Sequence, residues 1–263
     1  MSLLAVGVGV AAFDRFGPAI AATTDSGTFA DGITAPTTSS TVDATTTARP
    51  TPSSVTQSAA GASSVVSLNI PFPRSGPQKF TFATTTGPVL GTSGAIRTFR
   101  LAIETNVTVV TMADFAAKVN ETLGDPRSWI AGRTYRLQQV AASSAATFTI
   151  YLVTASTTNK MCAPLPTNSF TSCRNGSHVV LNLDRYMTSV SAYRDADISL
   201  DIYRTYMINH EVGHALGHGH QLCPAKGAPA PVMEQQTLGL HGCVANPWPY
   251  LNGRLYSGPS GTY

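Results

Sequence analysis

Charged residues are scarce in this chain: Asp, Glu, Lys and Arg make up only 12% of its 263 residues, against about 25% in a typical globular protein. The Lys and Arg residues are scattered and give a net charge of +3 with a pI near 8.7. No basic run is present that could follow a phosphate backbone, so we expect no nucleic-acid partner. Long apolar runs are lacking too, since none reaches the roughly 18 to 20 residues of a membrane-spanning helix.

The beginning of the chain does not have the composition of a folded domain. An apolar run at residues 3–13 has the length of a signal-peptide core, and Ala19-Ile20-Ala21 resembles a cleavage site. No Lys or Arg precedes the run, and charged residues separate it from that site. We interpret residues 1–21 as a signal-peptide-like or anchor segment, and an anchor would tether the protein to a membrane or cell surface.

A low-complexity segment follows the apolar run. Residues 22–64 are dominated by Thr, Ser, Ala and Pro, and Phe29 is their only aromatic residue. Such a stretch buries too little apolar surface to offset the entropy cost of ordering, so we predict a disordered linker with the composition of an O-glycosylated stalk. Residues 65–263 are then the folded domain.

Four cysteines are present, and no two of them form a C-x-x-C pair of the zinc-ribbon or redox kind. We interpret Cys162, Cys173, Cys223 and Cys243 as two disulfides, for which three connectivities are possible. Pairing of sequence neighbours would close short loops beside the motif described below. Disulfides persist in oxidising compartments, which indicates a secreted or cell-surface protein. The alternative is four free thiols in a cytosolic protein, each buried as a small hydrophobic group.

The first clear strand lies at residues 97–107. Phe99, Leu101 and Ile103 alternate there with Arg100 and Glu104, which is typical of a strand buried on one face only.

The rest of the domain alternates strands and helices before it becomes irregular. Thr111, three residues before Asp114, would cap a helix that ends at Gly124. Strands are predicted at residues 135–140, 147–153 and 178–184, and a second helix from about residue 197 to 217. The prolines at residues 224, 229, 231, 247 and 249 break any long element, and residues 253–263 are expected to form a loose tail.

The second helix carries a motif of fixed spacing, H-E-x-x-H-x-x-G-x-x-H. His210 and His214 are four residues apart, so a helix places both on one face. A third ligand needs the chain to turn back, and Gly217 allows this because glycine adopts left-handed φ/ψ at helix ends. The turn would bring His220 to the metal. The alternative is chance: two core histidines and one loop histidine.

The chemistry of the motif is that of a catalytic zinc site. Three imidazoles leave a fourth zinc position for water, and Glu211 is then placed to take the proton of that water. His218 is ambiguous, because it could compete with His220 or remain a surface residue without a special role.

The motif resembles that of the metzincin clan of zinc endopeptidases. Metzincins carry a methionine turn downstream, and Pro231-Val232-Met233-Glu234 stands thirteen residues after His220. The resemblance implies that Met233 forms a hydrophobic floor beneath the ligands. A wider resemblance, over residues 87–250, is to an actinobacterial family of exported, largely uncharacterised metzincin-like proteins, and it rests on residues 125–129, 172–176, 230–233 and 246–250.

Two positions depart from the better-known metzincins. Gln221 follows the third histidine and matches none of their main groups, and Gln235 stands where some of them have a tyrosine that helps with zinc and the oxyanion. A second oxyanion donor is therefore not identified. No cysteine upstream of Cys162 is available to block the zinc in a latent form.

We therefore predict one α+β domain of metzincin-like fold, in which a mixed twisted sheet lies over a central zinc-binding helix and a loop-rich C-terminal part holds the methionine turn. The expected activity is hydrolysis of peptide or protein substrates by a monomer with one Zn²⁺. The strand at residues 178–184 is expected to be an edge strand that binds extended substrate. The alternatives are an exported metal-binding module and a surface interaction domain with a structural zinc, neither of which needs Glu211.

Overall fold

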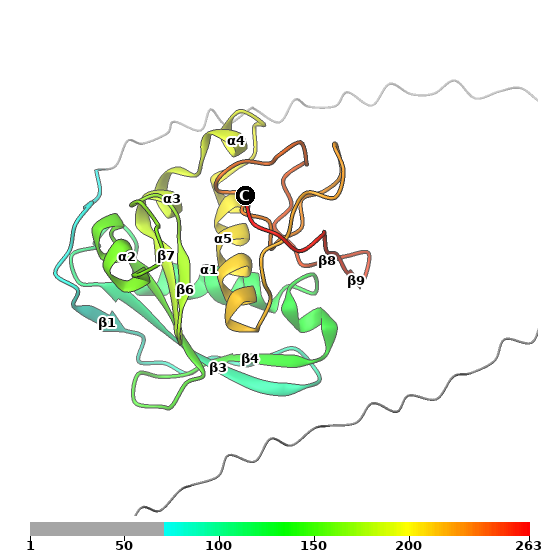
Figure 1. Ribbon diagram of the computed structural model, residues 1–263. Helices are drawn as coiled ribbons and strands as arrows, with labels where there is room; N and C mark the ends of the chain where they lie inside the picture. The colour runs from blue at the N-terminus through cyan, green and yellow to red at the C-terminus, as the bar shows by residue number, and fades with distance from the viewer. Residues whose placement is uncertain (1–70) are drawn as a thin grey trace, which may run out of the picture. The chain divides into compact units, whose positions relative to one another are not determined.

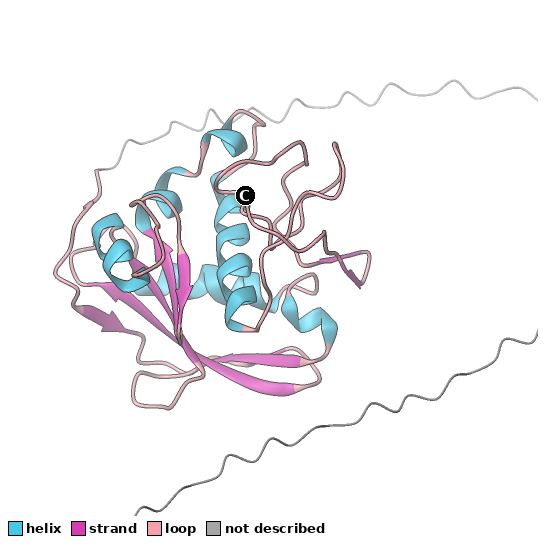
Figure 2. Cartoon of the chain, viewed as in Figure 1, coloured by secondary structure: helices cyan, strands magenta, loops and turns pink. Residues whose placement is uncertain are grey.

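Seven strands form one mixed sheet within residues 71–263, the part of the chain that the computed structural model describes. Helices pack against this sheet, so the predicted α+β single domain is confirmed (Figure 1, Figure 2). The segments predicted as an export or anchor sequence, 1–21, and as a linker, 22–64, lie outside the described residues, as does the predicted start of the domain at residue 65.

The elements follow the chain in the order that Figure 1 labels. The strands are β1 (Phe80–Phe82), β2 (Val89–Leu90), β3 (Ala95–Glu104), β4 (Tyr135–Gln139), β5 (Phe148–Val153), β6 (Cys173–Asn175), β7 (His178–Asn182), β8 (Tyr250–Leu251) and β9 (Arg254–Leu255). The helices are α1 (Met112–Gly124), the 3-10 turn η1 (Trp129–Gly132), α2 (Ala155–Cys162), α3 (Leu183–Thr188), α4 (Ser191–Arg194) and α5 (Leu200–Ala215).

The sheet has the order β2-β4-β3-β5-β7-β6, and β1 pairs with the end of β3. The central strands are parallel: β3 pairs in parallel with both β4 and β5, and β5 pairs in parallel with β7. The outer strands β1, β2 and β6 are antiparallel to their neighbours. The second, two-stranded sheet is the hairpin of β8 and β9 in the irregular C-terminal part.

The predicted half-burial of β3 is wrong, because helices cover both faces of the sheet. Phe99, Leu101 and Ile103 face α1 and α5, while Ala102 packs in a second core with α2. Glu104, expected to point to solvent, is fully buried. Its carboxyl group accepts hydrogen bonds from the amide and hydroxyl of Thr154, both at 2.9 Å, and these bonds offset the cost of burying a polar group.

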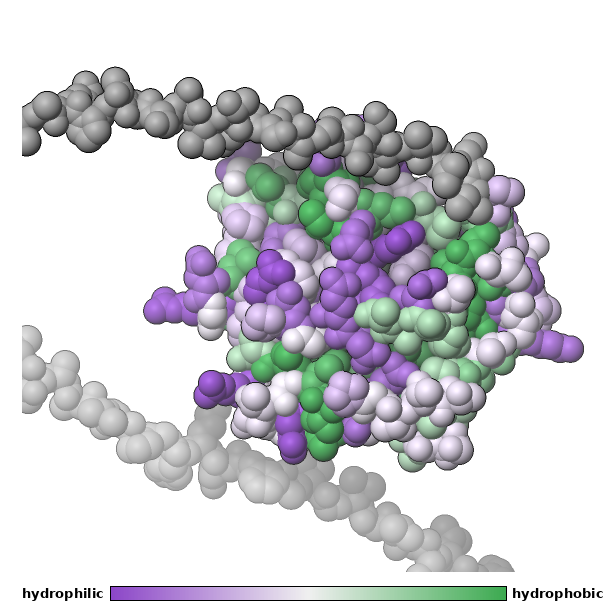
Figure 3. All heavy atoms as spheres, turned by 180° about the vertical axis from the view of Figure 1, so that it is seen from behind, coloured by the Kyte–Doolittle hydropathy of each residue, from purple (hydrophilic) through white to green (hydrophobic). Residues whose placement is uncertain are grey.

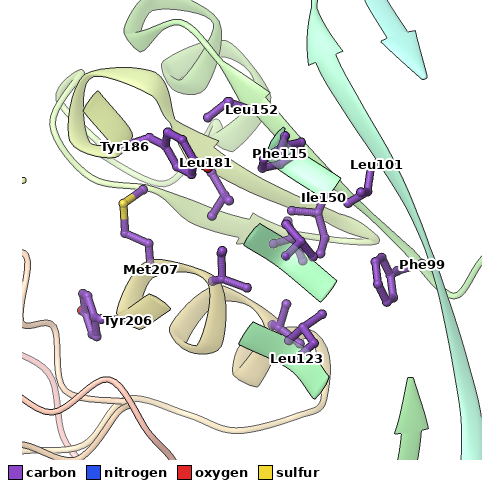
Figure 4. Close-up of a cluster of buried hydrophobic side chains, with 14 of the residues drawn as sticks. Phe99, Leu101, Phe115, Leu123, Ile150, Leu152, Leu181, Tyr186, Tyr206 and Met207 are labelled. Atoms are coloured by element: carbon purple, nitrogen blue, oxygen red, sulfur yellow. The ribbon is translucent and has the colours of Figure 1, made fainter. Parts of the chain in front are cut away.

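The larger core lies between the sheet and the helices α1 and α5. Figure 4 shows Phe115 and Leu123 of α1 and Met207 of α5 directed at the side chains of the central strands. Helix α1 begins at the predicted cap, where the Thr111 side chain accepts a hydrogen bond from the amide of Asp114. This packing fixes α5, the helix with the histidine motif, against the sheet.

The surface of the described residues mixes polar and apolar side chains. Figure 3 shows both kinds interspersed over the face that is turned away from the viewer in Figure 1. Among the described helices, none has both the length and the apolar character needed to cross a membrane.

Candidate metal centre

Helix α5 ends at a turn that reverses the chain immediately after the second histidine of the motif. Gly217 has a φ of +98°, in the left-handed region that glycine adopts without strain. The amide of His218 donates to the carbonyl of Gly213 at 3.0 Å, and the amide of Gly217 donates to that of His214 at 3.1 Å. These are the two hydrogen bonds of a Schellman motif. The turn sends the following residues back towards the helix.

The three histidines of the motif converge on one point. The Nε2 atom of His214 lies 3.2 Å from Nε2 of His210 and 3.0 Å from Nε2 of His220. Four-coordinate binding of one ion at about 2.0–2.1 Å would place such atoms roughly 3.3 Å apart. The spacing of the three nitrogens therefore fits a metal ion held by all three rings, and these residues form one possible metal-binding group.

Hydrogen bonds on the far side of two rings fix which nitrogen faces the metal. Nδ1 of His210 donates to the carbonyl of Val232 and Nδ1 of His214 to that of His218, both at 2.8 Å. Each Nδ1 therefore carries the proton, and both Nε2 atoms present a lone pair. Two lone pairs 3.2 Å apart repel each other unless a cation lies between them. The donor set thus has the tautomers and the outer hydrogen bonds of metal-ligating histidines.

Burial keeps the three imidazoles neutral, which is the form that binds a metal. Desolvation lowers the pKa of His210 well below its usual value, and the neighbouring His214 lowers it further. Desolvation also lowers the pKa of His214, and lowers that of His220 to about 4. At neutral pH the site therefore holds three uncharged nitrogen donors.

Glu211 lies beside the triad and lines the same cleft. Its side chain is 6% exposed, and its Oε2 atom has no hydrogen-bond partner among the described residues. Burial raises the pKa of its carboxyl to about 8. A cation bound by the neighbouring histidines would favour the charged form and lower this pKa. A carboxyl with an unused oxygen in a cleft is free to exchange a proton with a bound molecule.

Met233 packs against α5 at Gly213, between the first two histidines of the motif. A Cβ atom on Gly213 would lie 2.5 Å from Sδ of Met233 and 2.6 Å from Cζ2 of Trp129. Only glycine permits this approach. The same segment supports the site on both sides: the carbonyl of Val232 binds His210, and the carbonyl of Met233 accepts from the amide of Gln221 at 3.1 Å.

His218 lies apart from the triad. Its ring stacks on Trp129 with centroids 4.3 Å apart, and it lines the cleft. Trp129 itself is held by a hydrogen bond from its indole Nε1 to the carbonyl of Asn209, at 2.9 Å. Of the two histidines after the turn, His220 is the one whose ring joins His210 and His214. His218 instead caps the end of α5 through its backbone.

A cleft of about 660 Å³ opens in front of the triad. Residues 171–174, which include the first two residues of β6, form one wall of the cleft. Gln235 and Leu238, which follow the methionine turn, form another. The prediction that residues 178–184 form an edge strand is wrong. That stretch splits into β7 and the start of α3, and β7 pairs on both sides. The edge is β6, which a two-residue turn at Gly176 and Ser177 joins to β7 in a tight hairpin.

Both disulfides join sequence neighbours. The bond Cys162–Cys173 ties the end of α2 to β6, and Cys223–Cys243 ties the segment after His220 to the loop beyond the methionine turn. None of the four cysteines is a free thiol. Two disulfides indicate a protein that works outside the cytoplasm. Although Glu234 lies close to the second pair of sulfurs, that group is closed to metal because the sulfurs are bonded to each other.

The predicted loose tail is wrong, because the last residues pack along the segment that contains the third histidine. The amide of Gly261 donates to the carbonyl of His220 at 3.2 Å, and the amide of Leu222 donates to that of Pro259 at 2.8 Å. Tyr263 stacks on His241 with centroids 3.4 Å apart, and its hydroxyl accepts from the amide of Cys223. Thr262 and Tyr263 also line the cleft. The composition of the segment carried no signal for these backbone contacts.

Truncation after Tyr256 is therefore expected to weaken metal binding rather than unfold the domain. Loss of the bond to the His220 carbonyl frees the third ligand, and loss of such outer contacts lowers metal affinity by about 10- to 100-fold. Competition between the protein and a chelator for Zn²⁺ measures this change. Arg254→Ala, an exposed change in β9, is the control. Equal affinities of the truncated and full-length chains would contradict the role of the tail.

Glu234 is a buried carboxyl without a partner. Both its oxygens lack hydrogen bonds among the described residues, and burial raises the pKa of the group to about 7. The folded state thus holds its proton more tightly than the unfolded state, so wild type loses stability as pH rises from about 4.5 through 7. Glu234→Gln removes this loss. The variant should therefore gain stability relative to wild type as the pH rises. The difference between their free energies of unfolding is expected to increase by about 3 kcal/mol between pH 4.5 and pH 8.

Urea unfolding of the metal-free proteins at several pH values tests this expectation. Glu121→Gln, at an exposed position of α1, controls for the loss of one carboxyl and should follow the wild-type curve. A constant difference between Glu234→Gln and wild type over this range would show that folding does not raise the pKa of Glu234.

The fold and the site together define an α+β protein with a candidate three-histidine metal centre in a cleft. The chain belongs to a family described as a protein of unknown function (DUF3152), which matches residues 68–251. The matched region includes the triad, Glu211 and Met233 and ends before the tail. No curated protein and no solved structure matches the chain.

Proposed function

We propose that this protein is a metzincin-like, zinc-dependent endopeptidase. The observation that carries the proposal is that Glu211, buried and with an unused carboxylate oxygen, lines the cleft into which three histidine Nε2 atoms converge. A metal store would need the nitrogens but not the acid. Hydrolysis needs both, and it needs them on one side of a space that a substrate can enter.

The three histidines and Glu211 would have different roles in the reaction. His210, His214 and His220 would hold the zinc ion, which would supply a Lewis acid for the scissile carbonyl and a water of lowered pKa. The Glu211 carboxylate accepts the proton of the attacking water and then passes it to the leaving amine, as a general base and then a general acid. Its position in the cleft serves both steps, because the carboxylate oxygen without a partner among the described residues is open to a bound molecule.

The cleft offers an extended peptide a place to bind. Strand β6 pairs only with β7 among the described strands, and its open edge is on the side of the sheet next to α5 (Figure 1). A peptide that adds to this edge would use backbone hydrogen bonds, as in β-augmentation. Those bonds ignore side-chain identity, so they would suit an enzyme that acts on many sequences through one backbone geometry.

The methionine turn supports a metzincin-like assignment. Met233 contacts the motif helix at Gly213, and the residue before it receives the hydrogen bond of His210. Gln235 lines the cleft at the position where some metzincins have a tyrosine, so its amide is the side chain to consider as the missing oxyanion donor. We further propose a secreted or surface-tethered monomer that binds no nucleic acid.

The alternative of a structural metal site has less support. A closed zinc site has four protein ligands. Among the described residues, the group around the triad contains only the three histidines, with no Cys, Asp or Glu in reach. An exported module that only captures metal remains the competing function, and it leaves Glu211 without a role.

The test is hydrolysis of a mixed peptide library by the purified protein. We expect about one zinc per chain, cleavage that stops when a chelator removes the metal, and recovery when Zn²⁺ is returned. Products would be identified by mass spectrometry. One bound zinc without cleavage of any peptide would favour metal capture, and the absence of bound zinc would overturn both functions.

A further inference from the structure

The cleft contains one permanent cation. Among the described residues that line it, Arg174 is the only Lys or Arg, and Glu211 is the only Asp or Glu. Arg174 is the middle residue of β6 and is exposed. It therefore brings a positive charge to the wall along which an extended ligand would lie.

The charge of Arg174 is not used within the described part of the protein. Its guanidinium makes no hydrogen bond, ion pair or aromatic contact with any of residues 71–263. Other arginines do find such partners. Arg127 pairs with Asp125 and lies over Trp248, and Arg185 lies over Phe170. Arg174 thus keeps a free guanidinium fork at the cleft, the geometry that matches a carboxylate.

The position of Arg174 in the strand defines what would meet it. In an antiparallel pair, residues directly opposite each other have Cβ atoms about 4.5–5.5 Å apart on the same face, and opposite charges there stabilise the pair. A peptide added antiparallel to the open edge of β6 would place one of its residues opposite Arg174. The favoured side chain at that single position is Asp or Glu, and Lys or Arg is disfavoured.

The rest of the cleft reinforces this preference. The histidines contribute no negative charge, and a bound divalent cation adds positive charge. Most other lining residues are uncharged, for example Leu165, Thr171 and Leu238. No described acidic side chain in the lining offsets Arg174 other than that of Glu211, which the proposed mechanism assigns to proton transfer. Electrostatic complementarity of this kind mainly sets which ligands are selected.

We propose that the cleft selects peptide segments that carry an acidic side chain at the position opposite Arg174. This inference rests on the proposed endopeptidase function, because it assumes that the occupant is an extended peptide. It names the substrate class for the same site: polypeptides with Asp or Glu near the bond that is cut.

The experiment separates binding from cleavage. End-capped ten-residue peptides that differ only in having Glu, Gln or Lys at one position are offered to the zinc-loaded full chain. Turnover is followed with wild type, and binding is followed by fluorescence anisotropy with Glu211→Gln, which is not expected to cut them. The turnover assay is then repeated with the Arg174→Glu variant, and the binding assay with the double variant Glu211→Gln, Arg174→Glu. Arg254→Glu, an exposed arginine of β9 outside the cleft lining, is the matched charge reversal.

At one position along the peptide we expect Glu to be preferred over Gln by about two- to fivefold. Arg174→Glu should reverse the order in favour of Lys, and Arg254→Glu should leave it unchanged. The preference should also shrink as salt is raised from about 50 to 500 mM, because the pair is near the surface.

The outcomes distinguish the two proposals. Cleavage without an acidic preference, or with one that survives Arg174→Glu, overturns this inference and leaves the peptidase function standing. Binding of acidic peptides that depends on Arg174, without any cleavage by wild type, supports the inference and overturns the peptidase function. Neither cleavage nor Arg174-dependent binding overturns both.

Discussion

Glu211→Gln is expected to lower kcat by about 10³-fold or more while the protein still binds one zinc. General acid–base catalysis contributes about 10²- to 10⁴-fold, and here one carboxyl would serve both proton transfers. Gln has nearly the same shape but cannot accept and return a proton. KM should change little, because the substitution leaves the walls of the cleft in place. Steady-state kinetics on the best peptide of the library, with zinc content measured on the same samples, tests this result.

Glu121→Gln serves as the control for this experiment, since it makes the same chemical change on the exposed surface of α1. It should match wild type in kcat and in zinc content. If Glu211→Gln retains wild-type turnover, the proton is handled by another group and the assigned mechanism is wrong. If it loses its zinc, Glu211 supports the metal site, and the loss of activity says nothing about proton transfer.

Gly213→Ala is expected to be the most damaging of the conservative changes in the motif helix. The added methyl group would lie 2.5 Å from Sδ of Met233 and 2.6 Å from the ring of Trp129. Met233 can shift, but Trp129 is held by its hydrogen bond to the Asn209 carbonyl. Forcing a methyl group into a packed core costs about 1–3 kcal/mol. Helix propensity acts in the other direction, by about 1 kcal/mol in favour of Ala. We therefore expect a clear net loss of stability, together with weaker zinc binding.

Gly219→Ala is the matched control, because a Cβ atom there meets nothing within 4 Å. Thermal unfolding of both variants, with and without zinc, measures the effect. The difference should be larger in the zinc-bound proteins, since displacement of Met233 also disturbs Val232, which accepts the hydrogen bond of His210. Equal melting temperatures for the two variants would show that Met233 and Trp129 relax without cost.

The motif helix was predictable because its geometry is local. Residues four apart on a helix share a face, so the meeting of His210 and His214 needs no knowledge of the rest of the fold. The turn at Gly217 follows from the conformational freedom of glycine. Two disulfides were also predicted, because four cysteines without the spacing of a metal site most often form disulfides. Pairing of sequence neighbours was one of the three possible connectivities.

Features that depend on distant partners were not predictable. Glu104 was read as solvent-facing because alternation reports polarity and not what covers a face, and the cover here is α2. Strand β6 was missed because three residues give no periodicity, although the Asn175-Gly176 pair signalled the hairpin. The motif correctly predicted His220 as the third histidine of the group. What it did not predict is the place of His218, whose ring stacks on Trp129, a residue far away in the sequence.

The backbone contact between Gly261 and His220 has a practical consequence for anyone who expresses this protein. Tyr263 lines the cleft, so residues appended after it would start at its rim. A flexible ten-residue extension reaches roughly 17 Å, which is enough to bring added side chains to the triad. A polyhistidine tag in that position would supply competing imidazoles, raise the apparent zinc content and occupy the place of a substrate. Assays of metal and activity therefore call for an affinity tag without histidines, or for a tag that has been removed.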